Sequence, residues 1–151
     1  MNFNESVEYI HSLLAFGVKP GLERISMLLD LLGNPQDKLK FVHVAGTNGK
    51  GSTSTMIANI LTAEGYQTGL FTSPYVIDFC ERIQIDGKNI SKDIFAECVT
   101  AVREKTEELN RKNIVITEFE AITASAFLCF EKTECDYVVL EVGLGGRYDA
   151  T

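Results

Sequence analysis

A short apolar run at residues 41–45 leads into a glycine-rich segment and then into a helical pattern. This order limits the fold more than any other feature. Phosphate oxygens need several converging donors, and glycines let backbone N–H groups point inward without a side-chain clash. The helix start adds unpaired donors and the positive end of the helix dipole. The sequence therefore predicts a phosphate-binding loop made of Gly46, Thr47, Asn48, Gly49, Lys50, Gly51 and Ser52.

The loop departs from the general P-loop pattern, which has a glycine at position 44 and a serine or threonine directly after the lysine. This chain has Val44 and Gly51 there, and its hydroxyls come later, at Ser52 and Thr53. Lys50 would place a mobile point charge near the β and γ phosphates of a nucleotide. The alternative is an ordinary glycine turn with an exposed lysine. The density of glycines, hydroxyls and lysine between a strand and a helix favours the phosphate site.

Hydrophobic periodicity predicts alternating helices and strands along the chain. Helices are expected at 4–16, 21–32, from the end of the glycine-rich segment to about 64, 91–110 and 117–132, and strands at 41–45, 67–72 and 137–142. Asp86-Gly87 predicts a hairpin within residues 82–90. This alternation indicates an α/β fold, a mostly parallel sheet with flanking helices. Within the helix that follows the loop, the inward-facing residues are expected to be Met56, Ile57, Ile60 and Leu61.

Glu141 interrupts the apolar run of residues 137–142, which we expect to form a central strand. A buried carboxylate without a partner is costly, and Mg²⁺ is a natural partner because it prefers hard oxygen ligands. Parallel strands end at one edge of their sheet, where ligands bind. Glu141 and Ser73, which follows the strand at 67–72, are therefore expected beside the phosphate loop. A solvent-facing glutamate on an edge strand is the alternative.

Composition narrows the class of protein. The chain has 151 residues, 45% hydrophobic and 23% charged, as in ordinary soluble domains. It contains no apolar run of membrane-spanning length, and residues 1–8 lack the features of a secretory signal. A net charge of −7 argues against nucleic-acid binding. We expect a cytoplasmic monomer that binds neither membrane nor nucleic acid. The four cysteines form no C-x-x-C pair, which argues against a zinc site.

Several segments resemble the folylpolyglutamate synthase/dihydrofolate synthase family of the Mur-ligase superfamily. They include the phosphate loop with its Gly-Ser ending, Thr72-Ser73-Pro74, the Thr-Glu-Phe-Glu of residues 117–120, and residues 141–151. The last segment is the most specific, since the family usually reads Gly-Gly-Arg-Leu-Asp-Ala-Thr-Asn and only Tyr148 departs from it. Tyr75 and Val76 replace the family's His and Leu after Thr-Ser-Pro, which puts any role of that histidine in doubt.

The resemblance implies an ATP- and Mg²⁺-dependent ligase that adds L-glutamate to a folate or dihydropteroate carboxylate through an acyl phosphate. The fold would be of the Mur-ligase central domain type. Lys50 and Glu141 would be catalytic, and Ser73 and Glu141 would hold the metal. The substrate residues implied are Gly21, Leu22, Glu23, Arg24, Arg82, Thr117, Glu118, Phe119 and Asp149.

Members of this family are two-domain enzymes. The resemblance therefore implies that residues 1–151 are an incomplete N-terminal ATP-binding domain, and that a C-terminal glutamate-binding domain is absent from this chain. Alone, the chain is expected to bind nucleotide weakly and to ligate poorly or not at all.

Three alternatives stay open. One is a Mur-type ligase for a muramyl peptide, which the resemblance of Thr72-Ser73-Pro74 and Glu81-Arg82-Ile83 to the folate branch disfavours. Another is a non-catalytic nucleotide-binding module, although no purine-specificity segment such as Asn-Lys-x-Asp is present. The third is an α/β domain with no ligand. The sequence does not separate dihydrofolate synthase from folylpolyglutamate synthase.

Overall fold

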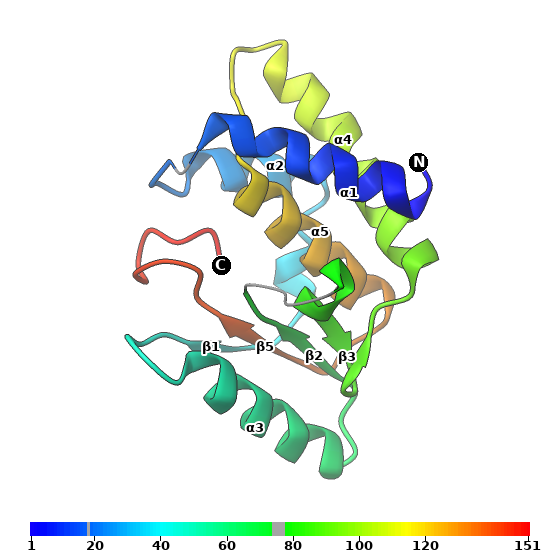
Figure 1. Cartoon of the computed structure of the whole chain (residues 1–151), viewed down its shortest axis with the longest axis vertical. Coiled ribbons are helices and arrows are strands. Elements are labelled where there is room, and N and C mark those ends of the chain that lie inside the picture. Colours follow the sequence, from blue (N-terminus) through cyan, green and yellow to red (C-terminus); the bar gives the residue numbers. More distant parts are fainter. Residues whose placement is uncertain (18, 74–77) are drawn as a thin grey trace.

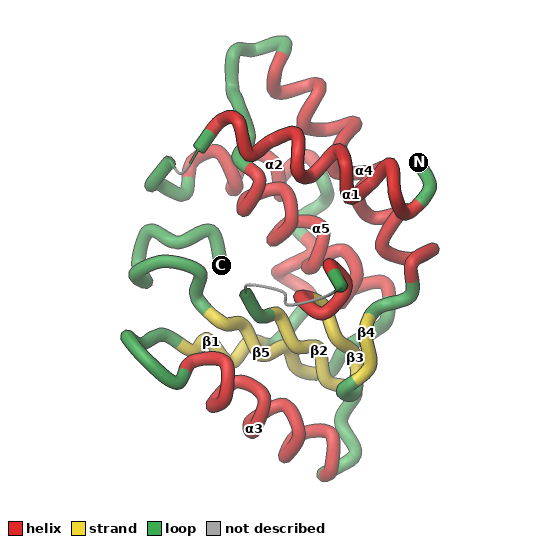
Figure 2. Tube along the Cα trace, in the orientation of Figure 1, coloured by secondary structure: helices red, strands yellow, loops and turns green. Residues whose placement is uncertain are grey.

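The computed structural model describes residues 1–17, 19–73 and 78–151. These residues form a mixed five-stranded sheet in the order β1-β5-β2-β3-β4 (Figures 1 and 2). β1 (Phe41–Val44), β5 (Tyr137–Glu141) and β2 (Thr68–Phe71) are parallel, and β3 (Ile83–Ile85) and β4 (Lys88–Asn89) add an antiparallel hairpin. The expected α/β class is confirmed. The parallel arrangement holds for three strands, and the hairpin at Asp86-Gly87 makes the sheet mixed.

β5 is the central strand of the parallel part, with β1 on one side and β2 on the other. Its residues Val138 and Val139 are fully buried because helices cover both faces of the sheet, which explains the continuous apolar sequence. The alternative of an edge strand for Glu141 is therefore wrong. Glu141 itself is only 6% exposed.

Helices lie on both faces of the sheet (Figure 1). α3 (Lys50–Ala63) covers one face, and α1 (Phe3–Ser12), α2 (Glu23–Leu31), α4 (Lys92–Asn110) and α5 (Glu118–Lys132) lie on the other. α5 lies nearest the sheet, and the main hydrophobic core is built around it. Of the described helices, none is long and apolar enough to cross a bilayer.

Three short 3₁₀ segments complete the described elements: η1 (Leu13–Phe16), η2 (Pro35–Lys38) and η3 (Phe79–Arg82). The first corrects the helix expected at 4–16, which is α-helical only as far as Ser12. Leu14 is 59% exposed because the tighter turn of η1 rotates it away from the core.

The inward face of α3 also differs from expectation. Met56 and Ile60 are 57% and 64% exposed, so the prediction that they face inward is wrong. The buried positions are Ser54 and Ala58, with Ile57 partly buried beside them. Small side chains four residues apart let the helix approach the sheet closely, and this turns the larger residues outward.

The buried thiol of Cys80 makes the stability of the fold depend on pH in the alkaline range. Burial, followed by the charge of Asp78, raises the pKa of the Cys80 thiol to about 11 from 9.0. As pH rises, the Cys80 thiol therefore ionises in the unfolded chain before it does so in the folded one. The contribution of this thiol to stability is complete below pH 9 and is lost as pH rises through about 11. We expect the free energy of unfolding to fall over this range by at most about 1.4 kcal/mol per pH unit for this group.

Urea unfolding between pH 8 and pH 10.5 checks this dependence. Burial also raises the pKa of Cys135 and of Tyr9, so some slope remains in any single variant. Cys80→Ala should flatten the slope, and an identical slope in this variant would contradict the assignment to Cys80.

Candidate functional site

The predicted phosphate loop connects the end of β1 to the start of α3. Gly49 is the N-cap of α3 and has a φ of 76°, a left-handed conformation that favours glycine. Its position leaves the first turn of α3 without a side-chain cap. The Lys50 ammonium donates a hydrogen bond to the Gly46 carbonyl oxygen at 2.8 Å, so it lies over the loop. Uncapped N–H groups and a lysine thus lie together in an exposed loop, an arrangement suited to an anion.

Glu141 and Ser73 lie together at the same edge of the sheet. Ser73 donates its backbone N–H to Glu141 Oε2 at 3.1 Å. A Cβ added at Gly51, in the first turn of α3, would lie 3.7 Å from both carboxylate oxygens of Glu141. The Glu141 carboxylate therefore lies between the phosphate loop helix and the end of β2.

A carboxylate and a serine hydroxyl are hard oxygen ligands of the kind that suit Mg²⁺, which is commonly held by one or two protein ligands together with phosphates and waters. Within the described ranges, no group of three or more His, Cys, Asp or Glu side chains could hold a metal by itself. The metal role of Ser73 and Glu141 stays a prediction.

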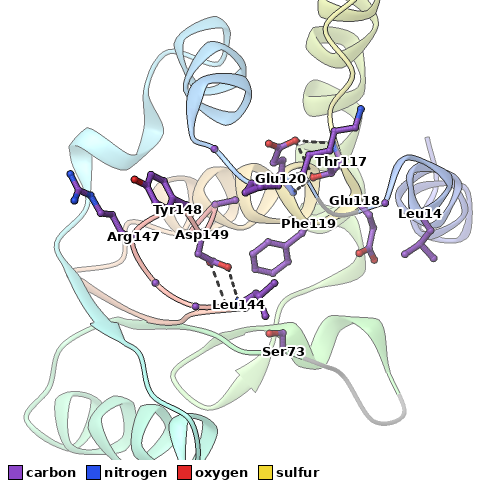
Figure 3. A pocket seen from close by; sticks show the side chains of 18 of the residues that line it. Leu14, Ser73, Thr117, Glu118, Phe119, Glu120, Leu144, Arg147, Tyr148 and Asp149 are labelled. Atoms are coloured by element: carbon purple, nitrogen blue, oxygen red, sulfur yellow. Dashed lines mark hydrogen bonds between the residues drawn. The ribbon is translucent and has the colours of Figure 1, made fainter.

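A cavity of about 550 Å³ lies between the segment that follows β5 and the first turn of α5 (Figure 3). Phe119 points into it, toward Leu144 and Asp149. Ser73 lines the cavity and its backbone N–H also contacts Glu141, so Ser73 connects the cavity to the carboxylate that lies against the first turn of α3. The predicted substrate residues that line it are Gly21, Arg82, Thr117, Glu118, Phe119 and Asp149.

Three other predicted substrate residues lie elsewhere. Leu22 is 40% exposed and lines a separate cavity of about 630 Å³ beside β1. The Glu23 carboxylate folds back over Gly21, since its Oε2 lies 2.6 Å from where a Cβ at Gly21 would stand. Arg24 pairs with Glu120 on α5. Tyr75 lies outside the described residues. Substrate contacts of all these residues stay predictions.

Asp149 holds the loop that follows β5. It is 9% exposed and accepts hydrogen bonds from the backbone N–H of Leu144 at 2.7 Å and of Gly143 at 3.3 Å. Its Oδ1 also accepts from the N–H and hydroxyl of Thr151, at 3.1 and 2.6 Å. Both carboxylate oxygens are thus engaged, and Asp149 shapes the wall of the cavity.

The sequence prediction missed Glu120 and the segment from Gly143 to Tyr148 as parts of this site. Glu120 is 2% exposed, and it forms a reciprocal capping box with Thr117 at the start of α5. A threonine followed three residues later by glutamate before an apolar run is the sequence signature of this box and would have identified it. Nothing in the sequence signals the close contact of Gly143 with Phe119.

Gly143 lies directly under the Phe119 ring. A Cβ added there would be 2.5 Å from Phe119 Cζ, so the ring would have to move. We expect Gly143→Ala to lower the free energy of unfolding by about 1–3 kcal/mol, through overpacking. Chemical denaturation measures this change.

Gly146→Ala is the matched control, since a Cβ there meets no atom within 4 Å. Adding Phe119→Ala to Gly143→Ala removes the clash, so the alanine at position 143 should cost less in this background. An equal cost of Gly143→Ala with and without the Phe119 ring would contradict the steric explanation.

No protein-family model matches the chain. The chain is 46% identical over 151 residues to the dihydrofolate synthase/folylpolyglutamate synthase of Bacillus subtilis (strain 168). The match covers 99% of this chain and 35% of the relative. The homologues of this chain are folylpolyglutamate and dihydrofolate synthases. The chain spans about a third of the length of these relatives.

Solved structures of folylpolyglutamate synthases share the fold. A complex with AMPPCP and folate has a TM-score of 0.90 and 42% identity, covering 100% of this chain and 37% of that one. The Mycobacterium tuberculosis folylpolyglutamate synthase complexed with ADP has a TM-score of 0.88 and 37% identity. That match covers 99% of this chain and 35% of the other. The described fold is thus that of the N-terminal part of folylpolyglutamate synthases.

Proposed function

We propose that this chain is the nucleotide-binding front part of an ATP-dependent ligase that joins L-glutamate to the carboxylate of folate or dihydropteroate. The observation that carries the proposal is the position of Glu141. Its carboxylate lies against the first turn of α3 on one side and against Ser73 on the other. A phosphate held by the loop and an acceptor held in the cavity would therefore meet at this residue. The homologous complex with AMPPCP and folate supports both ligands.

The chemistry has two steps. An acceptor carboxylate oxygen attacks the γ-phosphorus of ATP, and ADP leaves with the electrons of the broken P–O bond. The amine of L-glutamate then attacks the carbonyl carbon of this acyl phosphate, and inorganic phosphate leaves as the amide forms. Such chemistry depends on positioning and charge neutralisation. Lys50 and the uncapped N–H groups of α3 supply both to the transferring phosphoryl group.

Glu141 and Ser73 would hold Mg²⁺ at the junction of loop and cavity. When bound, the ion neutralises phosphate charge and orients the phosphoryl group. Phe119 and Leu144 are apolar side chains that line the same cavity, and they would shield the acceptor carboxylate from water. Exclusion of water matters because an acyl phosphate is readily hydrolysed.

The relatives are about three times as long as this chain. The proposed ligase would therefore also contain a C-terminal glutamate-binding domain outside residues 1–151. By itself, the chain would bind nucleotide weakly and ligate poorly or not at all. A cytoplasmic monomer that binds neither nucleic acid nor membrane stays an expectation from the sequence.

The test is ATP-dependent phosphate release by the polypeptide extended to the length of its relatives, with L-glutamate and either dihydropteroate or a reduced folate as acceptor. Release with one of these acceptors supports the ligase, and the preferred acceptor defines the activity. Release only with a UDP-muramyl peptide would overturn the folate assignment. A polypeptide that binds AMPPCP but turns over no acceptor would support the non-catalytic module.

A further inference from the structure

We infer that Arg24 is a positioning residue, which fixes the separation of two walls of the cavity and so determines how tightly the acceptor binds. This role rests on the proposed function. One wall contains residues 19–21, between η1 and α2, and the other is the first turn of α5, with Thr117, Glu118 and Phe119. Arg24 lies outside the cavity lining. Its effect on an acceptor is therefore indirect.

The Arg24 guanidinium joins the two walls. Its Nη2 donates to the Lys19 carbonyl oxygen at 2.5 Å, and the same nitrogen lies 2.9 Å from Glu120 Oε1. Its Nε donates to Glu120 Oε2 at 3.4 Å. The planar guanidinium thus engages a backbone carbonyl of the first wall and a carboxylate of the second at the same time.

Glu120 transmits this connection to the residues that line the cavity. Its Oε2 accepts from the backbone N–H of Thr117 at 2.8 Å and from the Thr117 hydroxyl at 3.0 Å. The Glu120 side chain is 3% exposed, so water competes little for these bonds. The orientation of the first turn of α5, and with it the direction of Phe119, therefore depends on a network that ends at Arg24 (Figure 3 shows the Glu120–Thr117 part).

Lysine is the discriminating substitution at this position. An ammonium keeps the charge opposite Glu120, but it lacks the rigid fork that reaches the carboxylate and the Lys19 carbonyl together. Arg24→Lys therefore preserves the buried ion pair while loosening the link to residues 19–21. The phosphate loop is held by other contacts, so its nucleotide affinity should not change.

The experiment compares the polypeptide extended to the length of its relatives with its Arg24→Lys variant, by amide hydrogen exchange and by titration with dihydropteroate and with AMPPCP. We expect exchange at residues 19–21 and 117–120 to accelerate about tenfold. We expect the Kd for dihydropteroate to rise about tenfold, while the Kd for AMPPCP stays within about twofold. A merely structural role would shift both Kd values together.

Arg103→Lys is the matched control, because Arg103 pairs with Glu107 on the exposed surface of α4. This variant should leave exchange at both walls and both Kd values unchanged. Unchanged exchange and unchanged dihydropteroate affinity in Arg24→Lys, or an equal loss for both ligands, would overturn the positioning role alone. A wild-type polypeptide of that length that binds AMPPCP but neither dihydropteroate nor a reduced folate would overturn the folate assignment, and with it the acceptor role of Arg24.

Discussion

Arg24→Ala is expected to lower the free energy of unfolding by about 3 kcal/mol, because it leaves the buried Glu120 carboxylate without its cation. The Glu120 side chain is 3% exposed and that of Arg24 is 21% exposed. The Thr117 hydrogen bonds to Glu120 remain, and the partial exposure of Arg24 screens its charge, so the loss lies at the lower end for a broken buried pair. Urea unfolding monitored by circular dichroism measures it.

Two variants separate the buried charge from other effects of truncation. The double variant Arg24→Met/Glu120→Gln removes both charges while keeping similar volume, and it should recover most of the lost stability. Arg103→Ala breaks an exposed i,i+4 pair and should cost less than about 1 kcal/mol. If Arg24→Ala costs no more than Arg103→Ala, the Glu120 network does not stabilise the fold.

Lys50→Ala is expected to lower ATP-dependent ligation by the longer polypeptide about 10²–10³-fold, through loss of the charge opposite the transferring phosphoryl group. The fold should be unaffected, since the Lys50 ammonium donates an exposed hydrogen bond to a carbonyl of its own loop. Phosphate release measures turnover, and urea unfolding of the same variant measures stability. AMPPCP titration then shows how much of the loss is in nucleotide binding.

Lys88→Ala serves as the control, because Lys88 lies exposed on the hairpin, away from the phosphate loop. It should leave turnover and nucleotide affinity unchanged. An equal, small effect of both substitutions would support the alternative of an ordinary glycine turn with an exposed lysine.

Features set by neighbouring residues could be predicted from the sequence. The strand, glycine turn and helix around Lys50 follow from local backbone preferences, as do the hairpin at Asp86-Gly87 and the Ser91 cap of α4. The position of Ser73 and Glu141 at one edge followed from the rule that parallel strands end together, and the register of β5 with β1 and β2 agrees with it. The inward face of α3 could not be predicted from periodicity, because apolar residues lie all round that helix and close packing selected Ser54 and Ala58.

The sequence by itself determined the α/β class, the strand–glycine turn–helix around Lys50 and the acid at the end of β5, because each depends on residues adjacent in the chain or on one general rule of sheet geometry. Only the tertiary structure decided the shape of the cavity. Its walls depend on Gly143 beneath the Phe119 ring and on Arg24 paired with Glu120, contacts between segments far apart in the sequence. Such contacts depend on distances of a few tenths of an ångström between packed elements, and no local pattern of residue types specifies them.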